Sequence, residues 1–143
     1  MNARSGNPDF VLTGQPGYGP GAEGRALVSQ HGFSARYDLN RERGVFSRKE
    51  HDLFGESVVD VILIAPVSKG GIATSWMLRE MASRNVAPLG IILHSTNPVI
   101  VQGAILAGVP IMQGLLPPAH QVVRTGDWVR MDPAGRTVEV WRR

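Results

Sequence analysis

The 143-residue chain has the length of one ordinary domain and is long enough to bury a hydrophobic core. Its residues are 43% hydrophobic and 19% charged, a balance that excludes a disordered chain and a coiled coil. The net charge is +3, and the basic residues are spread along the chain. Only "RERGVFSRK" at 41–49 resembles a basic patch, so we do not expect a nucleic-acid partner.

Neither an apolar run of membrane-spanning length nor a signal peptide is recognisable in the sequence. The chain also has no cysteine, which excludes disulfides, a thiolate nucleophile and an iron–sulfur cluster ligated by this chain. We therefore expect a cytoplasmic protein with no membrane partner. No two histidines stand at a ligand spacing such as i, i+4, so no metal site is expected either.

The N-terminal segment is too rich in glycine and proline for a helix or an interior strand. Residues 6–21 contain five glycines and three prolines, so we expect an irregular arm over 1–20 and a single domain over 21–143. A short strand is predicted at 25–29, and the long loop predicted over 31–44 has no sustained periodicity.

The middle of the chain predicts a buried strand followed by a helix. The run "SVVDVILIA" at 57–65 is almost continuously β-branched and aliphatic, which is typical of a strand covered on both faces. From 71 to 84, apolar residues recur at helical spacing and predict an amphipathic helix. We expect Trp76, Met77 and Met81 to belong to the core of the domain.

Two further strand and helix segments complete the pattern. A second buried strand is predicted at 89–95, and a short helix at 97–108 begins with asparagine at the N-cap and proline at the first helical position. A third strand is predicted in "VPIMQG" (109–114), and "DWVRMDPAGRTVEVW" predicts a hairpin with its turn at "DPAG". The fold class is therefore α/β, with a mixed sheet, crossover helices and a C-terminal hairpin.

The loop "APVSKGGIATSW" at 65–76 is the candidate functional site, because ligands of such folds lie beyond the carboxyl ends of the strands. Backbone N–H groups around Gly70 and Gly71, next to a helix N-terminus, suit a carboxylate or phosphate, and Lys69 adds a positive charge. The spacing of a P-loop is absent. In the alternative interpretation, the two glycines only make a tight turn that Ser68 caps.

Four segments carry a family resemblance: "GPGAEGRALVS", "GVFSRKEHDLFGESV", "ILIAPVSKGGIATSW" and "VQGAILAGVPIM". In this order they resemble the small, swivel-domain subunit of the aconitase X family. This family of hydro-lyases includes cis-3-hydroxy-L-proline dehydratase and the archaeal mevalonate phosphate dehydratase. Where this chain has His51, the family has a His-Pro-Leu-x-Gly-x-Ser pattern, so the resemblance makes His51 a site residue that orients substrate or a neighbouring loop. In the alternative interpretation His51 is only a turn residue.

The resemblance implies an aconitase-like swivelling β/β/α domain that closes over a larger partner subunit. That subunit would carry the iron–sulfur cluster and most substrate contacts, in agreement with the missing cysteines here. In such dehydrations a base on the swivel domain removes the proton next to a carboxylate, while the cluster iron acts as a Lewis acid. The family assigns the base to a serine, which needs a dry pocket, N–H donors and a neighbouring cation such as Lys69.

The loop departs from the family pattern at that serine. The family reads Gly-Lys-Gly-Ser-x-x-Gly-Ser, whereas this chain reads "SKGGIATS" at 68–75, with Gly71 at the position of the first serine. Ser68 or Ser75 must then act as the base, and we favour Ser68 because it lies on the loop itself. The expected substrate is a hydroxylated carboxylate such as cis-3-hydroxy-L-proline, with a mevalonate phosphate type as the alternative.

Other functions stay open at this level. Gly71 is the main support for a non-catalytic swivel module that binds a small carboxylate or regulates a partner. A nucleic-acid-binding domain would depend on segment 41–49 alone, and its binding should be sensitive to salt. Ser75 has a structural alternative, as a helix-interior serine bonded to the carbonyl four residues before it.

Overall fold

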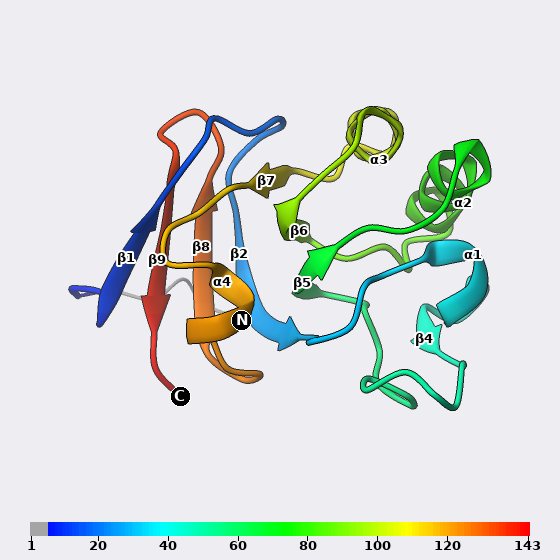
Figure 1. The fold of residues 1–143 in the computed structure, drawn as a ribbon, viewed down its shortest axis with the longest axis horizontal. Helices are drawn as coiled ribbons and strands as arrows, with labels where there is room; N and C mark the ends of the chain where they lie inside the picture. Colours follow the sequence, from blue (N-terminus) through cyan, green and yellow to red (C-terminus); the bar gives the residue numbers. More distant parts are fainter. Residues whose placement is uncertain (1–5) are drawn as a thin grey trace.

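The computed structural model describes residues 6–143, which form a mixed sheet with helices on both of its faces (Figure 1). The main sheet contains seven strands: β1 (Phe10–Thr13), β2 (Ala22–Val28), β5 (Val61–Val67), β6 (Gly90–Ser95), β7 (Ile111–Gln113), β8 (Trp128–Asp132) and β9 (Thr137–Trp141). The helices are α1 (Ala35–Asp38), α2 (Ile72–Ser83), α3 (Pro98–Ala107) and α4 (Ala119–Val122). A separate ribbon pairs β3 (Leu39–Asn40) with β4 (Val45–Phe46). The predicted α/β class is confirmed.

The strands of the main sheet are ordered β1-β9-β8-β2-β5-β6-β7. The neighbouring strands β2, β5, β6 and β7 run parallel to one another. Helix α2 connects β5 to β6, and helix α3 connects β6 to β7. Alternate residues of β5 enter two different cores. Leu63 and Ala65 pack on the side of α2 and α3, while Ile62 and Ile64 pack on the side of α4. The prediction of a strand covered on both faces is therefore confirmed, although the strand begins at Val61.

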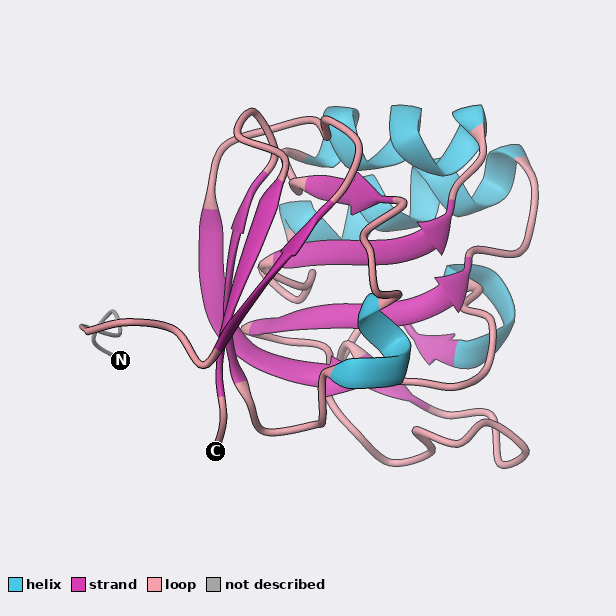
Figure 2. Cartoon of the chain, turned by 60° about the vertical axis from the view of Figure 1, so that its left-hand side comes forward, coloured by secondary structure: helices cyan, strands magenta, loops and turns pink. Residues whose placement is uncertain are grey.

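The other half of the sheet is antiparallel and is built by β1, β9 and β8 against β2. Figure 2 shows these strands standing at a steep angle to the parallel ones. The predicted C-terminal hairpin joins β8 to β9 through 133–136. The backbone N–H of Gly135 donates to Asp132 Oδ1 at 3.1 Å, and Arg136 takes the left-handed conformation with φ of 62°. A local turn sequence therefore specified this connection.

Two predictions about irregular segments need correction. The arm expected over 1–20 is not irregular at Phe10–Thr13, because β1 pairs with β9 from the far end of the chain; residues 1–5 lie outside the described part. Glycine and proline around a strand are tolerated at a sheet edge, where one side needs no partner. The loop predicted over 31–44 contains α1 and β3, which are too short to produce a recognisable periodicity.

The prediction that Trp76 belongs to the core is wrong. Its side chain is 58% exposed, and the guanidinium of Arg79 lies 5.7 Å from the centre of its ring. The buried positions of α2 are Thr74, Ser75, Leu78 and Met81. These positions follow the helical repeat and leave Trp76 on the outer face, since neighbouring residues differ by about 100° around the helix.

The helices are short in this structure. Within residues 6–143, none has the length and hydrophobicity needed to cross a membrane.

Candidate functional site

The predicted loop lies where β5 ends and α2 begins, at the carboxyl edge of the parallel strands. Backbone pairing between β2 and β5 continues past both strands, into the exit segment of β2 (29–34) and the β5–α2 loop (68–71). The N–H of Phe33 donates to the carbonyl of Val67 at 2.9 Å, and the N–H of Lys69 donates to the carbonyl of Phe33 at 2.7 Å. The loop is therefore held beside a second segment that sequence reasoning did not include in the site.

Two predicted residues are available for a ligand at this edge. Ser68 is partly exposed, and no residue within 6–143 forms a hydrogen bond with its hydroxyl. Lys69 is exposed, and no carboxylate of the described chain forms an ion pair with its amine. The lysine stem crosses Gly32, where a Cβ would lie only 2.6 Å from Lys69 Cε. The absence of a side chain at position 32 therefore makes room for the lysine.

The two glycines of the loop have different roles. Gly70 has a φ of 109°, which disfavours other residues, and a Cβ there would collide with the hydroxyl of Thr74. Gly71 is the N-cap of α2, supplies no side-chain cap, and has open space where a Cβ would stand. A serine at position 71, as in the family pattern, would thus point into free space at the mouth of the loop.

Thr74 is a candidate site residue that sequence reasoning missed. It lies in the first turn of α2 beneath Gly70, is 2% exposed, and its hydroxyl lacks a hydrogen-bond partner in the described residues. Buried polar atoms are rarely left without a partner, so this hydroxyl is a candidate contact for a ligand at the start of the helix. A signal for it was present in the sequence, because the family pattern has glycine at this position.

Ser75, the second predicted base, faces the other way. Its hydroxyl donates to the carbonyl of Val99 in α3 at 2.6 Å, and the residue is buried. A Cβ at Gly103 of α3 would come within 2.7 Å of Ser75 Cα, so the two helices touch closely here. This hydroxyl bonds a neighbouring helix rather than the carbonyl four residues before it. Of the two predicted bases, only Ser68 has a hydroxyl without a hydrogen-bond partner in residues 6–143.

His51 contacts the exit segment of β2. Its Nε2 donates to the carbonyl of Gly32 at 3.1 Å, and its Nδ1 accepts from the N–H of Leu53 at 3.1 Å. The ring is buried and stacks on Phe46, with ring centres 4.6 Å apart. Of the two roles considered from the sequence, these contacts support orientation of a neighbouring segment, the one on which the Lys69 stem lies.

Asp52 links the same exit segment to the turn that carries His51. Its carboxylate accepts from the hydroxyl of Ser29 at 2.6 Å and from the N–H of Gln30 at 2.8 Å. Partial burial alone would raise the pKa of the Asp52 carboxyl. The two hydrogen bonds, together with nearby His31 and His51, outweigh this effect and lower the pKa below its usual value.

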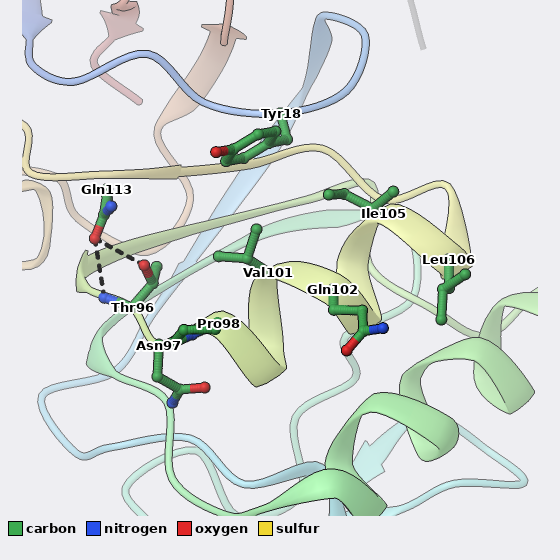
Figure 3. Close-up of a pocket in the computed structure, with 9 residues that line it drawn as sticks. All are labelled: Tyr18, Thr96, Asn97, Pro98, Val101, Gln102, Ile105, Leu106 and Gln113. Carbon is green, nitrogen blue, oxygen red and sulfur yellow. Dashed lines mark hydrogen bonds between the residues drawn. The ribbon is translucent and has the colours of Figure 1, made fainter.

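A cavity of about 550 Å³ lies beside α3 rather than at the loop (Figure 3). At its polar end, Gln113 Oε1 accepts from both the N–H and the hydroxyl of Thr96, at 3.1 and 2.7 Å. The rest of its lining is mostly apolar and comes from Tyr18, Pro98, Val101, Ile105 and Leu106, with Asn97 and Gln102. Nothing in the local sequence pattern predicted this cavity, because its walls meet only in the folded chain.

Comparison with known proteins identifies the family of this chain. The family model of the aconitase X swivel domain matches residues 11–140, which is nearly the whole chain. The chain therefore belongs to the aconitase X swivel-domain family, and the resemblance seen in the sequence is confirmed.

The similar proteins are named as enzyme subunits. The phosphomevalonate dehydratase small subunit of Thermococcus gammatolerans is 31% identical over 90% of this chain and 96% of its own length. The subunit of the same name from Methanopyrus kandleri is also 31% identical, over 82% of this chain and 87% of its own length. The crystal structure of Thermococcus kodakaraensis aconitase X in its holo-form superposes with a TM-score of 0.87 and 28% identity, covering 93% of this chain and 99% of the other.

The lowered pKa of Asp52 predicts a contribution to stability that is lost in acid. Because the pKa is lower in the folded chain than in the unfolded chain, the stabilisation is present above about pH 4 and disappears as pH falls through the folded-state pKa. Asp52→Asn should therefore lower the melting temperature at pH 6, and the difference from wild type should shrink toward pH 2.5. Thermal unfolding in chelator-containing buffer measures this effect.

The matched control for this measurement is Glu56→Gln, which alters an exposed carboxylate in the same region. At every pH, Glu56→Gln should melt at nearly the same temperature as wild type. A deficit in Asp52→Asn that stays constant from pH 6 to 2.5 would contradict an ionic role for Asp52.

Proposed function

We propose that this chain is the small subunit of a two-subunit aconitase X hydro-lyase, and that its β5–α2 loop faces the substrate. The observation that carries the proposal is a group of polar atoms at the N-terminus of α2 that have no partner within residues 6–143: the buried hydroxyl of Thr74, the partly exposed hydroxyl of Ser68 and the exposed amine of Lys69. Such a group suits an anionic ligand. The names of the relatives, each a dehydratase small subunit, support a larger partner.

The substrate that we propose is of the phosphomevalonate type, a hydroxylated carboxylate that also carries a phosphate. Relatives covering most of this chain bear the phosphomevalonate dehydratase name, which supports this choice. The substrate that the sequence analysis put first, cis-3-hydroxy-L-proline, finds no support in these comparisons, whereas its alternative of the mevalonate phosphate type does. Lys69, which has no ion-pair partner within residues 6–143, and a helix N-terminus at the same edge suit a substrate with two anionic groups.

In this proposal Ser68 takes the proton from the carbon next to the substrate carboxylate. Lys69 and the N–H groups at the start of α2 would favour the deprotonated serine and hold the anionic substrate. The iron–sulfur cluster that the family resemblance implies would belong to the larger subunit, since this chain has no cysteine, and would supply the Lewis acid for the departing hydroxyl.

The surface next to the loop suits contact with that larger subunit. Ile72 and Trp76 stand one turn apart on the outer face of α2, and they are 72% and 58% exposed. Large apolar side chains exposed beside a polar site are typical of a surface that a partner covers. Closure of the swivel domain on the larger subunit would bury both side chains and exclude water from the loop.

The second candidate function is a non-catalytic module that binds a small carboxylate. Gly71 favours it, because the position where the family has serine carries no hydroxyl here and is open to solvent. The two functions differ in one measurable property, which is turnover in the presence of the larger subunit.

The first prediction from this proposal is dependence on the partner. The chain alone should not dehydrate 5-phosphomevalonate, because it provides no ligands for an iron–sulfur cluster. Co-expressed with the large subunit encoded in the same genome, it should form a stable complex with dehydratase activity, measured by product formation under anaerobic conditions. A complex that forms and binds the substrate but never turns it over would favour the non-catalytic module.

The second prediction concerns the base. Ser68→Ala should lower the turnover of the assembled enzyme by about two to four orders of magnitude, the usual scale for a positioned general base, with little change in substrate binding. Ser75→Ala is the matched control, because its hydroxyl bonds α3. That variant should lose about 1 kcal/mol of stability and retain most of its activity.

Gly71→Ser tests, in the same assay, whether position 71 faces the substrate. There is room for the side chain, so a serine there should partly restore turnover in the Ser68→Ala background. Wild-type turnover in Ser68→Ala and in the Ser68→Ala, Ser75→Ala double variant would disprove serine-base chemistry in this chain.

The third prediction concerns charge at the loop. Lys69→Ala should raise the KM of the assembled enzyme by about tenfold or more, because a charge-assisted contact with an anion is lost. Its melting temperature should stay within a degree or two of wild type, since the amine has no ion-pair partner in the described chain. Lys49→Ala, the other lysine of the chain, is the control and should leave KM unchanged. Equal KM values for wild type and Lys69→Ala would indicate that the loop is only a structural turn and binds no ligand.

A further inference from the structure

The fold brings two histidines and an aspartate together on the side of the exit segment of β2 away from the β5–α2 loop. One ligand atom from each of His31, His51 and Asp52 lies within 4.8 Å of the others. Asp52 Oδ1 is 3.2 Å from His51 Nδ1 and 3.7 Å from His31 Nδ1. His31 and His51 are far apart in the sequence, which is why their spacing predicted no metal site.

We propose that His31, His51 and Asp52 form a binding site for a divalent transition-metal ion, of which Zn²⁺ suits the donor set best. Two imidazoles and one carboxylate are a ligand set that zinc accepts, with one position left for water or another ligand. Neighbouring ligand atoms around a tetrahedral zinc ion lie about 3.3–3.5 Å apart. The two separations that involve Asp52 Oδ1 are close to this range, and the ligand atoms of the cluster, all within 4.8 Å of one another, would close around an ion by a movement of His31. The exposed His31 side chain has the freedom to make it.

Both imidazoles already present a lone pair on the side of the cluster. His51 Nδ1 accepts from the N–H of Leu53 at 3.1 Å, and His31 Nδ1 accepts from the N–H of Asp52 at 3.2 Å. In both contacts Nδ1 acts as an acceptor, which is also the role of a metal ligand. A bound ion would take the place of these two backbone contacts.

Contacts around the cluster resemble those that support metal ligands. The contact of His51 Nε2 with the carbonyl of Gly32 holds the ring so that Nδ1 lies on the side of the cluster. The carboxylate of Asp52 is itself held by the hydroxyl of Ser29 and the N–H of Gln30. A ligand whose other atoms are already bonded loses little freedom on binding a metal.

The site does not follow from the family resemblance. The family pattern has proline directly after the histidine, where this chain has Asp52, so the pattern itself contains no carboxylate ligand at this position. A bound ion would connect the exit segment of β2 to the turn at 48–53 and so immobilise Gly32, over which the Lys69 stem lies. We expect a bound ion to reduce the mobility of the exit segment of β2, which lies beside the β5–α2 loop.

Metal binding by the full-length, tag-free chain tests the site without any activity assay. After treatment with a chelator, the chain is titrated with Co²⁺ at pH 7.5, followed by visible absorption, and then with Zn²⁺ in competition. We expect one Co²⁺ per chain, displaced by one Zn²⁺, and a melting temperature that rises with Zn²⁺.

Two exposed ligands provide the variants, since replacing the buried His51 endangers folding. His31→Ala and Asp52→Asn should each weaken Zn²⁺ binding at least about 100-fold, more than the loss of a supporting contact. His120→Ala is the matched control, because His120 lies beside His94 with ring centres 5.9 Å apart, outside the cluster. The proposal is overturned if wild type binds Zn²⁺ no more tightly than His31→Ala, or if His120→Ala weakens binding as much as His31→Ala.

Discussion

The candidate site depends on backbone pairing that continues beyond the ends of two parallel strands. The hydrogen bonds from Phe33 to Val67 and from Lys69 to Phe33 join the exit of β2 to the exit of β5. Because these bonds fix the register of both segments, they determine which residues meet at the carboxyl edge of the sheet. His51 and Asp52 then hold the β2 exit from the side away from the β5–α2 loop, so the lysine rests on a segment that is itself supported.

Three departures from the family pattern fall on this one edge. Gly71 removes a hydroxyl from the mouth of the loop, Thr74 adds an unpartnered hydroxyl beneath it, and Asp52 adds a carboxylate behind it. Position 71 has open space, and the carboxylate of Asp52 is held by hydrogen bonds to Ser29 and Gln30. All three differences therefore concern polar groups at the candidate edge of a fold that matches the family, in line with the general rule that folds carry different sites.

The swivel domain presents two distinct surfaces. The loop edge combines unpaired polar groups with the exposed Ile72 and Trp76, whereas the cavity beside α3 is mainly apolar and ends at the Thr96–Gln113 hydrogen bonds. In the proposed enzyme the first surface closes on substrate and the larger subunit. The contact between Ser75 of α2 and Gly103 of α3 lies between these two surfaces. It determines how closely the two helices approach each other, and therefore where the start of α2 lies.

The sequence by itself determined the α/β class, the central strands, the two crossover helices, the C-terminal hairpin and the candidate loop. These features depend on local periodicity, caps and turn residues, which each segment contains within itself. The family, too, was recognisable from motifs in their order. Ser68 and Lys69 were identified as candidates because a loop between a buried strand and a helix has a known place in such a sheet. Only the tertiary structure decided the rest. Strand β1, the outward position of Trp76, the bond from Ser75 to α3 and the meeting of His31 with His51 all depend on groups distant in the chain. No local pattern encodes such contacts, since they arise from the register of paired strands and the phase of packed helices.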